Sequence, residues 1–475
     1  MNKLRATIGL SFIMAIGFSS IFFSSCRKKS RDGMIIFTRS PQKVQNINYV
    51  SGDSWRYIPQ AQIVALDPEK PEASLKVLTS DFYSARAPQI SYDGNYLIFA
   101  AQLKQNDPWQ IWEMDLNNLK SRQVTSSGEN CTDPVYLPGG RLLFSKFAAN
   151  DTLKAGHSLY TCNPDGSNLK RITFNPHTYF ASNVLSDGRV LTIGRQLFPD
   201  KGSPMYMVLR PDGTKAEMFY KGIGGSDLTG QGLETINGRI VFIESDKSNP
   251  GSGNLISISY NRPLHSRMNL TSEIKGDFRA VFPQHSGRLL VSYRKSGSER
   301  YALYEFDPES KALGKAIYNN NDYDVLEAVV AAKHDRPKKL PSELDMGVKT
   351  GLLMCQDINV MNIMTTGLVT KSSGIKIVGI DSTLGVVQVA EDGSFYLKVL
   401  ADKPFQIKTI DKDGNVLRSP CGWIWLRPNE RRGCVGCHED PEMTPENRVP
   451  LSVKKPPVII PMHVKKVVEK KVSLE

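Results

Sequence analysis

Cysteine and histidine are both scarce in this sequence, with seven of each among 475 residues. Cysteines spread this thinly exclude a small scaffold held together by many disulfides. The sequence also lacks a P-loop, a dinucleotide-binding glycine loop and a catalytic triad, so these common signatures of enzymes are missing. Apolar residues make up 40% of the chain, which is enough to bury a core, and the length favours two or three domains.

Long apolar runs are rare as well, and the one that stands out lies at the N-terminus. Lys3 and Arg5 precede a nearly continuous apolar run, Ala6–Phe23, and two serines then lead to Cys26. This order is typical of a bacterial lipoprotein signal. We therefore expect residues 1–25 to be removed and Cys26 to be lipidated, which anchors the protein in the cell envelope, facing the periplasm or on the outer membrane. An uncleaved anchor is the alternative, because the run is near the lower length limit for a spanning helix.

Positive charge is in excess mainly at the C-terminal end. The formal net charge is +12, and residues 454–475 hold six lysines against two glutamates. We interpret this segment as a solvated basic tail, the usual state of a run of like charges. The sequence contains no nucleic-acid-binding motif, and we expect no nucleic-acid partner.

A repeat of about 48 residues runs through the first two thirds of the chain. Turn glycines between strand-like runs recur at intervals of 46, 48, 50 and 49 residues, at Gly94, Gly140, Gly188, Gly238 and Gly287. Asp-Gly and Asn-Gly pairs favour tight hairpins because they tolerate positive φ. A second turn recurs in the other half of each repeat, so each repeat predicts a four-stranded antiparallel unit. Units of this size are typical of propeller blades.

The second turn occurs six times and the first only five times, which predicts how the ring closes. The first blade begins at Met34 with no strand before it, and the run Asp324–Ala332 has no blade of its own. That run would supply the missing strand and remove an open sheet edge. We therefore predict a six-bladed β-propeller over residues 33–333, with seven blades as the less favoured alternative.

A second, smaller β-domain is expected after the ring. Residues 334–349 are basic and contain prolines, as linkers often do. Residues 350–420 hold five strand-like runs separated by Asp-Gly turns at Asp392 and Asp413, which predicts a β-sandwich-like domain. The predicted fold class is therefore all-β.

The cysteines outside the signal need separate treatment. Cys131 and Cys162 lie in one predicted blade but at its opposite ends, and a disulfide needs Cα atoms within about 7 Å. We expect both to be buried thiols. For Cys355 and Cys421 three outcomes stay open: a disulfide, a metal shared with His438, or buried thiols, which is the default.

Cys434, Val435, Gly436, Cys437 and His438 have the spacing of c-type haem attachment. Two thiols at this spacing can add to the two vinyl groups of the porphyrin, and the adjacent histidine can then ligate the iron. Zinc and dithiol chemistry are the alternatives. No second cysteine pair stands at zinc-ribbon spacing, and no thioredoxin-like pattern surrounds the motif. We predict one covalent haem c in a binding segment over residues 421–453.

Other residues near the motif have less certain roles. Met443, His463 and the linker residue His334 are the candidate distal ligands, and an open iron site is the alternative. Trp423 and Trp425 could line the haem or belong to a core. The arginines of this segment could bind haem propionates or lie in a solvated turn; these are Arg427, Arg431 and Arg432.

The sequence around the motif resembles the haem-binding stretch of the hydrazine synthase alpha subunit family. The resemblance covers about Gly351–Val453, including Ser419–Asp440 around the motif and Glu391–Phe405 before it. It implies an N-terminal propeller, a β-domain and a c-type haem.

The resemblance also implies site residues, and this chain departs from the family there. It implies that the motif histidine, here His438, binds zinc while a tyrosine further on ligates the iron. The tyrosine position falls near Glu442, and no tyrosine follows Tyr396. The chain has one Cys-x-x-Cys-His motif, whereas the family enzyme carries a further haem domain. We expect that this chain alone does not make hydrazine.

These observations favour an exported, lipid-anchored, monohaem c-type cytochrome-like redox protein. It would transfer electrons to a redox protein partner or carry out small-molecule chemistry at the haem. The alternative is a propeller-based protein-binding module of the cell envelope, in which the haem is an accessory electron relay. A purely structural envelope protein is the third hypothesis.

Overall fold

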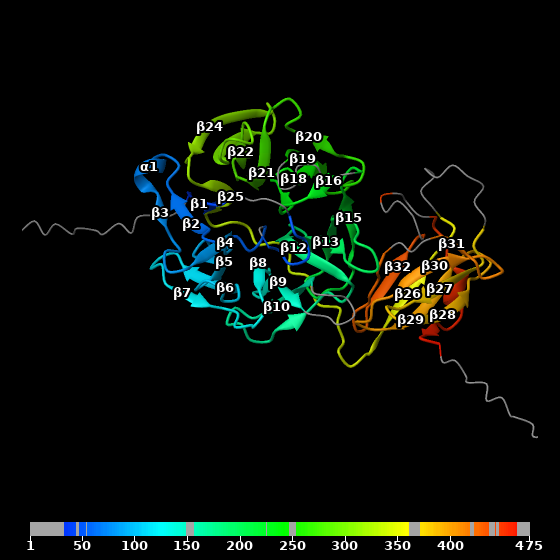
Figure 1. Cartoon of the computed structure of the whole chain (residues 1–475). Coiled ribbons are helices and arrows are strands. Elements are labelled where there is room, and N and C mark those ends of the chain that lie inside the picture. Colours follow the sequence, from blue (N-terminus) through cyan, green and yellow to red (C-terminus); the bar gives the residue numbers. More distant parts are fainter. Residues whose placement is uncertain are drawn as a thin grey trace, which may run out of the picture. The chain divides into compact units, whose positions relative to one another are not determined.

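The computed structural model describes residues 33–43, 47–53, 55–148, 156–224, 226–246, 253–360, 371–418, 422–436, 442 and 446–462. Over these ranges the regular structure is almost entirely β-strand, with one short helix, α1 (Pro71–Ser74), and one 3₁₀ turn, η1 (Leu451–Lys454). The all-β prediction is therefore confirmed (Figure 1). None of the helices in this part of the chain is long and apolar enough to cross a membrane. The predicted signal, residues 1–25, and Cys26 lie outside the described residues.

The N-terminal strands form antiparallel sheets of the size expected for blades. Four of these sheets have four strands each. The first holds β25 (Asp324–Ala331), β1 (Met34–Ser40), β2 (Gln62–Leu66) and β3 (Lys76–Val77). The second holds β4 (Ser84–Ile90), β5 (Tyr96–Gln102), β6 (Gln110–Asp115) and β7 (Ser121–Gln123). The third holds β8 (Cys131–Tyr136), β9 (Leu142–Ala148), β10 (Gly156–Cys162) and β11 (Lys170–Arg171). The fourth holds β12 (His177–Val184), β13 (Val190–Gln196), β14 (Met205–Leu209) and β15 (Glu217–Lys221).

The next nine strands form one larger sheet. Its first part holds β16 (Ser226–Leu228), β17 (Leu233–Glu234), β18 (Arg239–Asp246), β19 (Gly253–Ser259) and β20 (Met268–Asn269). Its second part holds β21 (Asp277–Pro283), β22 (Leu289–Arg294), β23 (Ala302–Asp307) and β24 (Ala312–Tyr318). The two parts meet through a single register pair, Gly253 with Phe278. Figure 1 shows these sheets arranged around a common centre, as in a propeller.

The predicted closing strand is confirmed. Strand β25 pairs antiparallel with β1, from Met34 opposite Ala331 to Ser40 opposite Asp324. The pairing covers the edge of β1 with backbone partners and buries apolar residues on both strands. Residues nearly three hundred positions apart therefore belong to one sheet.

The predicted hairpin turns are also confirmed, and the linker packs against two of them. All five turn glycines have φ between 70° and 90°. The linker, residues 334–349, contains no helix or strand, and its backbone forms hydrogen bonds with residues beside these turns. The His334 N–H donates to the Tyr92 carbonyl (3.1 Å) and the Lys338 N–H to the Ser186 carbonyl (3.0 Å). At Gly188, a Cβ atom would lie 2.1 Å from the Lys338 carbonyl oxygen, so the close approach of the linker requires glycine there.

The second domain is a sandwich of two four-stranded sheets. One holds β32 (Arg431–Cys434), β26 (Thr350–Cys355), β29 (Phe395–Leu400) and β33 (Val458–Ile460). The other holds β28 (Thr383–Gln388), β27 (Gly374–Val378), β30 (Gln406–Ile410) and β31 (Val416–Arg418). Both sheets contribute to one core, with Leu353 and Leu397 from the first and Ile375 and Ile407 from the second. This confirms the predicted strands after the linker.

Two predicted boundaries need correction. Strand β32 lies in the segment assigned to haem binding, 421–453, and pairs in parallel with β26. Strand β33 lies in the expected basic tail, 454–475, and pairs in parallel with β29. Without them both edges of the β26–β29 sheet would lack backbone partners. The sandwich therefore extends through both segments to Ile460.

Candidate haem-attachment site

The first cysteine of the motif ends a strand of the sandwich. Strand β32 runs parallel to β26, and the register pairs Cys434 with Cys355. Parallel register partners lie on the same face of the sheet. Cys355 is buried in the sandwich core, and the half-buried Cys434 packs against that core. The structure thus places the Cys434 thiol beside apolar residues, at the point where the chain leaves the sheet.

Backbone hydrogen bonds fix the next two residues of the motif. The Gln356 N–H donates to the Cys434 carbonyl (2.9 Å), and the Asp357 N–H donates to the Val435 carbonyl (3.0 Å). Gly436 is buried, and a Cβ atom at this position would lie 2.4 Å from the carbonyl oxygen of Val360. Only glycine fits this approach, so the packing requires the glycine of the motif.

Several predicted site residues lie outside the described residues. They are Cys437, His438, Met443, His463, Cys421 and the lipidation site Cys26. Of the predicted distal ligands, His334 is described. It lies on the linker, with its ring centroid 5.2 Å from that of Tyr92 on the propeller. The structure does not bring His334 into contact with the described part of the motif.

The donor set of the motif fits a covalently attached haem. Cys434 offers a half-buried thiol at a fixed strand end, and Cys437 and His438 follow at the spacing that haem c requires. The apolar surroundings of Cys434 suit a porphyrin edge. Among the residues that the structure describes, no three His, Cys, Asp or Glu side chains gather to hold a metal ion. His438 lies outside these residues, so zinc binding there stays a prediction.

Glu430 connects the motif strand to the propeller. Its side chain is fully buried, and Arg432 donates to Glu430 Oε1 from both Nε (3.0 Å) and Nη2 (2.6 Å). The Lys215 N–H, from the turn between β14 and β15, donates to the same oxygen (2.9 Å). Glu430 Oε2 accepts the Arg427 N–H (2.8 Å). The Glu430 carboxylate, which directly precedes β32, thus accepts hydrogen bonds from residues of both domains.

Two arginines form hydrogen bonds and ion pairs that were not predicted from the sequence. Arg427 is buried and donates to Asp402 (2.8 Å) and to the Asp212 carbonyl (3.1 Å). Arg432 binds Glu430 and the Ala216 carbonyl (3.1 Å). Neither lies in a solvated turn, because each already pairs with a carboxylate. The exposed side chain of Arg431 stays a candidate partner of a propionate.

Both tryptophans pack on the propeller. Trp425 is 1% exposed and belongs to a core cluster with residues of the third and fourth sheets, such as Leu159 and Tyr179. The Trp423 indole N–H donates to the carbonyl of Phe198 in the loop between β13 and β14 (2.8 Å). For Trp425 the core assignment is therefore confirmed.

Comparison with known proteins supports the resemblance that the sequence around the motif indicates. Residues 328–439 match the hydrazine synthase alpha subunit middle domain. The chain is 24% identical to the hydrazine synthase subunit alpha of Kuenenia stuttgartiensis over 535 aligned positions, covering 85% of this chain and 65% of that protein. The structure matches Kuenenia stuttgartiensis hydrazine synthase with a TM-score of 0.77 and 20% identity, covering 89% of this chain and 71% of the other. TolB from Acinetobacter baumannii matches with a TM-score of 0.45, at 15% identity, over 63% of this chain and 67% of the other.

This chain is similar to the hydrazine synthase alpha subunit over most of its length. It spans about 65% of the length of the Kuenenia subunit. The matched middle domain, residues 328–439, includes Cys434, Cys437 and His438 and begins within β25.

Glu442 contacts the propeller. The resemblance to hydrazine synthase alpha implies a tyrosine near this position. The N–H of Leu264 donates to Glu442 Oε1 (2.5 Å), and Arg262 Nε lies 3.5 Å from Glu442 Oε2. Both partners lie between β19 and β20. A carboxylate held in this way serves the contact between the motif region and the propeller.

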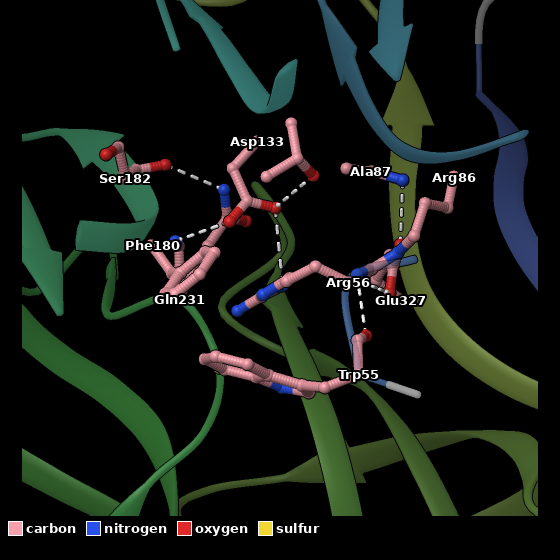
Figure 2. Close-up of polar contacts among 12 residues, drawn as sticks. Trp55, Arg56, Arg86, Ala87, Asp133, Phe180, Ser182, Gln231 and Glu327 are labelled. Carbon is pink, nitrogen blue, oxygen red and sulfur yellow. Dashed lines mark hydrogen bonds and ion pairs between the residues drawn. The ribbon is translucent and has the colours of Figure 1, made fainter. Parts of the chain in front are cut away.

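Sequence analysis missed a buried cluster of charges in the propeller. Arg56, Arg86, Asp133 and Glu327 meet there as ion pairs (Figure 2). A signal existed, because Glu327 interrupts an otherwise apolar strand. The partners come from three different sheets and one loop, however, so spacing along the chain could not pair them.

Proposed function

We propose that this protein is an exported, lipid-anchored redox protein that carries one haem c. Cys434 and Cys437 would hold the haem through thioethers, and His438 would ligate the iron. The observation that carries the proposal is the fixed motif strand: Cys434 ends β32, and Gly436 is packed where only glycine fits. When bound, the haem would supply an iron that exchanges electrons or binds a small ligand.

The scaffold of this proposal is a six-bladed propeller. Counting the nine-stranded sheet as two blades joined at one register pair, with four further sheets, gives six. The contact of the propeller with the motif strand, through Glu430 and Lys215, would hold the haem region in place. We propose the cell envelope as the location, on the strength of the predicted lipid anchor at Cys26.

The ligation of the iron decides between two redox roles. Met443 and His463 stay the candidate distal ligands, and His334 is less favoured because it packs on Tyr92 of the propeller. A saturated iron would favour electron transfer to a protein partner, and an open iron would favour small-molecule chemistry. Zinc on His438 is the family-like alternative.

Hydrazine synthesis is the activity in the name of the relative, and we propose that this chain does not carry it out alone. The chain spans about 65% of that subunit and has one haem-attachment motif. Purified protein given ammonium, nitric oxide and an electron donor should form no hydrazine. Detection of hydrazine above the level of a haem-free control would contradict this proposal.

The visible spectrum of the purified protein, oxidised and reduced, tests the proposed function. The protein should be made in a host that attaches c-type haem, and the reduced form should show the sharp bands of haem c. Carbon monoxide should shift the reduced Soret band at once if the iron is open, and slowly or not at all if a distal ligand is present. Single replacement of Met443, His463 or His334 should open a closed site in only one case. A protein without haem absorbance would overturn the proposal.

A further inference from the structure

The innermost strands of the propeller share a backbone irregularity. Register shifts interrupt β4 between Arg86 and Gln89, β8 between Thr132 and Val135, and β12 between Phe180 and Asn183. Each shift contains a non-glycine residue with positive φ: Ala87 at 56°, Asp133 at 51° and Ala181 at 55°. Such conformations are disfavoured for residues with a Cβ atom, and they persist only where the surroundings hold them.

Carboxylates from neighbouring sheets hold two of these bulges. The Ala87 N–H donates to Glu327 Oε1 (2.8 Å), and the Ala181 N–H donates to Asp133 Oδ2 (2.7 Å). In both cases the acid lies on the inner strand of the preceding sheet. The bulges therefore bring backbone donors and acidic side chains together, as the contact between Ala87 and Glu327 shows (Figure 2).

One of the two ion pairs is complete. Arg86 binds Glu327 through two contacts, from Nε to Oε1 (3.2 Å) and from Nη2 to Oε2 (3.0 Å). Its third nitrogen, Nη1, donates to the Trp55 carbonyl (2.8 Å). Burial alone would raise the pKa of Glu327, but the charge and hydrogen bonds of Arg86 lower it. This pair needs no further ligand.

The second ion pair is incomplete. Arg56 is buried, with Nη1 3.3 Å from Asp133 Oδ1 and Nη2 donating to the Thr229 carbonyl (3.3 Å). Its Nε has no hydrogen-bond partner in the described structure, and neither has the buried Thr229 Oγ1. Buried donors without partners are costly, and a bound molecule often explains them.

Arg56 and Thr229 both line a cavity between the innermost strands of the propeller. Its volume is about 60 Å³, which is room for roughly four water molecules. The ionisable side chains in its wall are three arginines, Arg56, Arg86 and Arg279, and two acids, Asp133 and Glu327, so the wall carries a net charge of +1. The side chain of Glu327 is 25% exposed and forms part of this wall.

We propose that this cavity binds a small, singly charged oxyanion, in contact with Arg56 Nε and Thr229 Oγ1. One negative charge neutralises the excess of the wall, and the two orphaned groups supply donors at the same place. A planar anion of three or four heavy atoms matches the space. Carboxylates such as formate and inorganic anions such as nitrate share this chemistry. The site lies in the propeller and does not depend on the haem.

Isothermal titration of the purified full chain at constant ionic strength tests the proposal, with formate, nitrate and sulfate as separate probes. At least one monoanion should bind saturably, and whichever binds identifies the source, organic or inorganic. Sulfate should bind at least tenfold more weakly, because its second charge is uncompensated. If neither monoanion gives saturable heat, the proposal is overturned.

Two variants locate the site. Thr229→Val keeps the shape of the side chain but removes the hydroxyl, and it should weaken binding about tenfold. Thr409→Val is the matched control, because Thr409 Oγ1 is also buried without a partner in the described structure but belongs to the sandwich strand β30. Arg279→Gln removes one of the three positive charges of the wall, and it should also weaken binding at least tenfold. Unchanged affinity in Thr229→Val and Arg279→Gln proteins with wild-type circular dichroism would refute this assignment.

Discussion

Cys355 and Cys434 are register partners on two adjacent parallel strands, β26 and β32. Neighbouring strands lie about 4.8 Å apart, a Cα separation that permits a disulfide. Cys434 therefore has a neighbouring thiol on its own sheet in addition to Cys437, three residues further along the chain.

The first prediction concerns this pair in haem-free protein. Treatment with oxidised glutathione should link Cys355 to Cys434: the two thiols lose two electrons and two protons, and glutathione disulfide is reduced to two thiols. Peptide mapping under non-reducing conditions should detect the linked peptides. In haem-loaded protein the link should be absent, because a thioether occupies Cys434. A Cys434–Cys437 disulfide as the sole product would contradict the prediction.

Glu430 should be necessary for the contact between the motif strand and the propeller. Glu430→Ala removes the acceptor of Arg432, Arg427 and Lys215 and leaves the Arg432 guanidinium, which is only 13% exposed, without its carboxylate. Breaking a buried ion pair in this way costs about 3–5 kcal/mol. Thermal unfolding and limited proteolysis should show earlier loss of the sandwich and earlier cleavage before β32.

A matched control for this change is Glu343→Ala. Glu343 pairs with Arg210 at 3.3 Å but is 38% exposed at its side chain, so its loss should cost at most about 1 kcal/mol. Equal effects of the two substitutions would show that Glu430 has no special role.

Two buried histidines should make the propeller sensitive to acid. Burial lowers the pKa of His157 and His177 to about 3. In the unfolded chain each takes up a proton below its ordinary pKa of about 6.5, while in the folded protein both stay neutral. Stability therefore falls as the pH drops from about 6.5 towards 3, by about 2 kcal/mol for each histidine at pH 5.

Melting temperatures between pH 7 and pH 4.5 check this effect. His177→Leu should reduce the loss at low pH, because both ring nitrogens of His177 lack partners in the described structure. His285→Gln, at an exposed position, should leave the pH dependence unchanged. A His177→Leu protein as acid-sensitive as the wild type would show that other groups cause the loss.

Membrane attachment should depend on Cys26. Cys26→Ser removes the thiol that would carry the lipid, so fractionation should recover the variant as an unprocessed precursor or in the soluble fraction. Metabolic labelling with a fatty acid should mark the wild type only. A variant that stays membrane-bound in high salt and is still processed like the wild type would instead favour a different anchor.

The sequence was sufficient to predict the features that repeat or lie close together in the chain. The spacing of turn glycines such as Gly94 and Gly188 predicted hairpins, and the unassigned run after Asp324 predicted the strand that pairs with β1. The sandwich strands were predicted from strand-like runs separated by Asp-Gly turns. In each case the signal lies within one hairpin or one apolar run.

The features that escaped prediction depend on contacts between distant segments. Strand β32 joins β26 across about eighty residues in parallel register, which no local pattern encodes. Arg427 could not be paired with Asp402 from the sequence, because these residues are twenty-five positions apart and meet only in the folded chain. Glu430 lies two residues from Arg432, but no local pattern shows that its side chain is buried against the propeller. The charges around the central cavity come from four different sheets and one loop, for the same reason.

The central claim is that Cys434 and Cys437 carry a covalent haem, and the intact mass of the purified protein tests it most directly. The protein should be produced with a c-type haem maturation system that also modifies a known cytochrome in the same cells. The account predicts a mass increase equal to one haem that survives denaturation, persists in Cys162→Ala, and is lost in Cys434→Ala combined with Cys437→Ala. A wild-type chain with the unmodified mass, beside a fully modified control cytochrome, would contradict it.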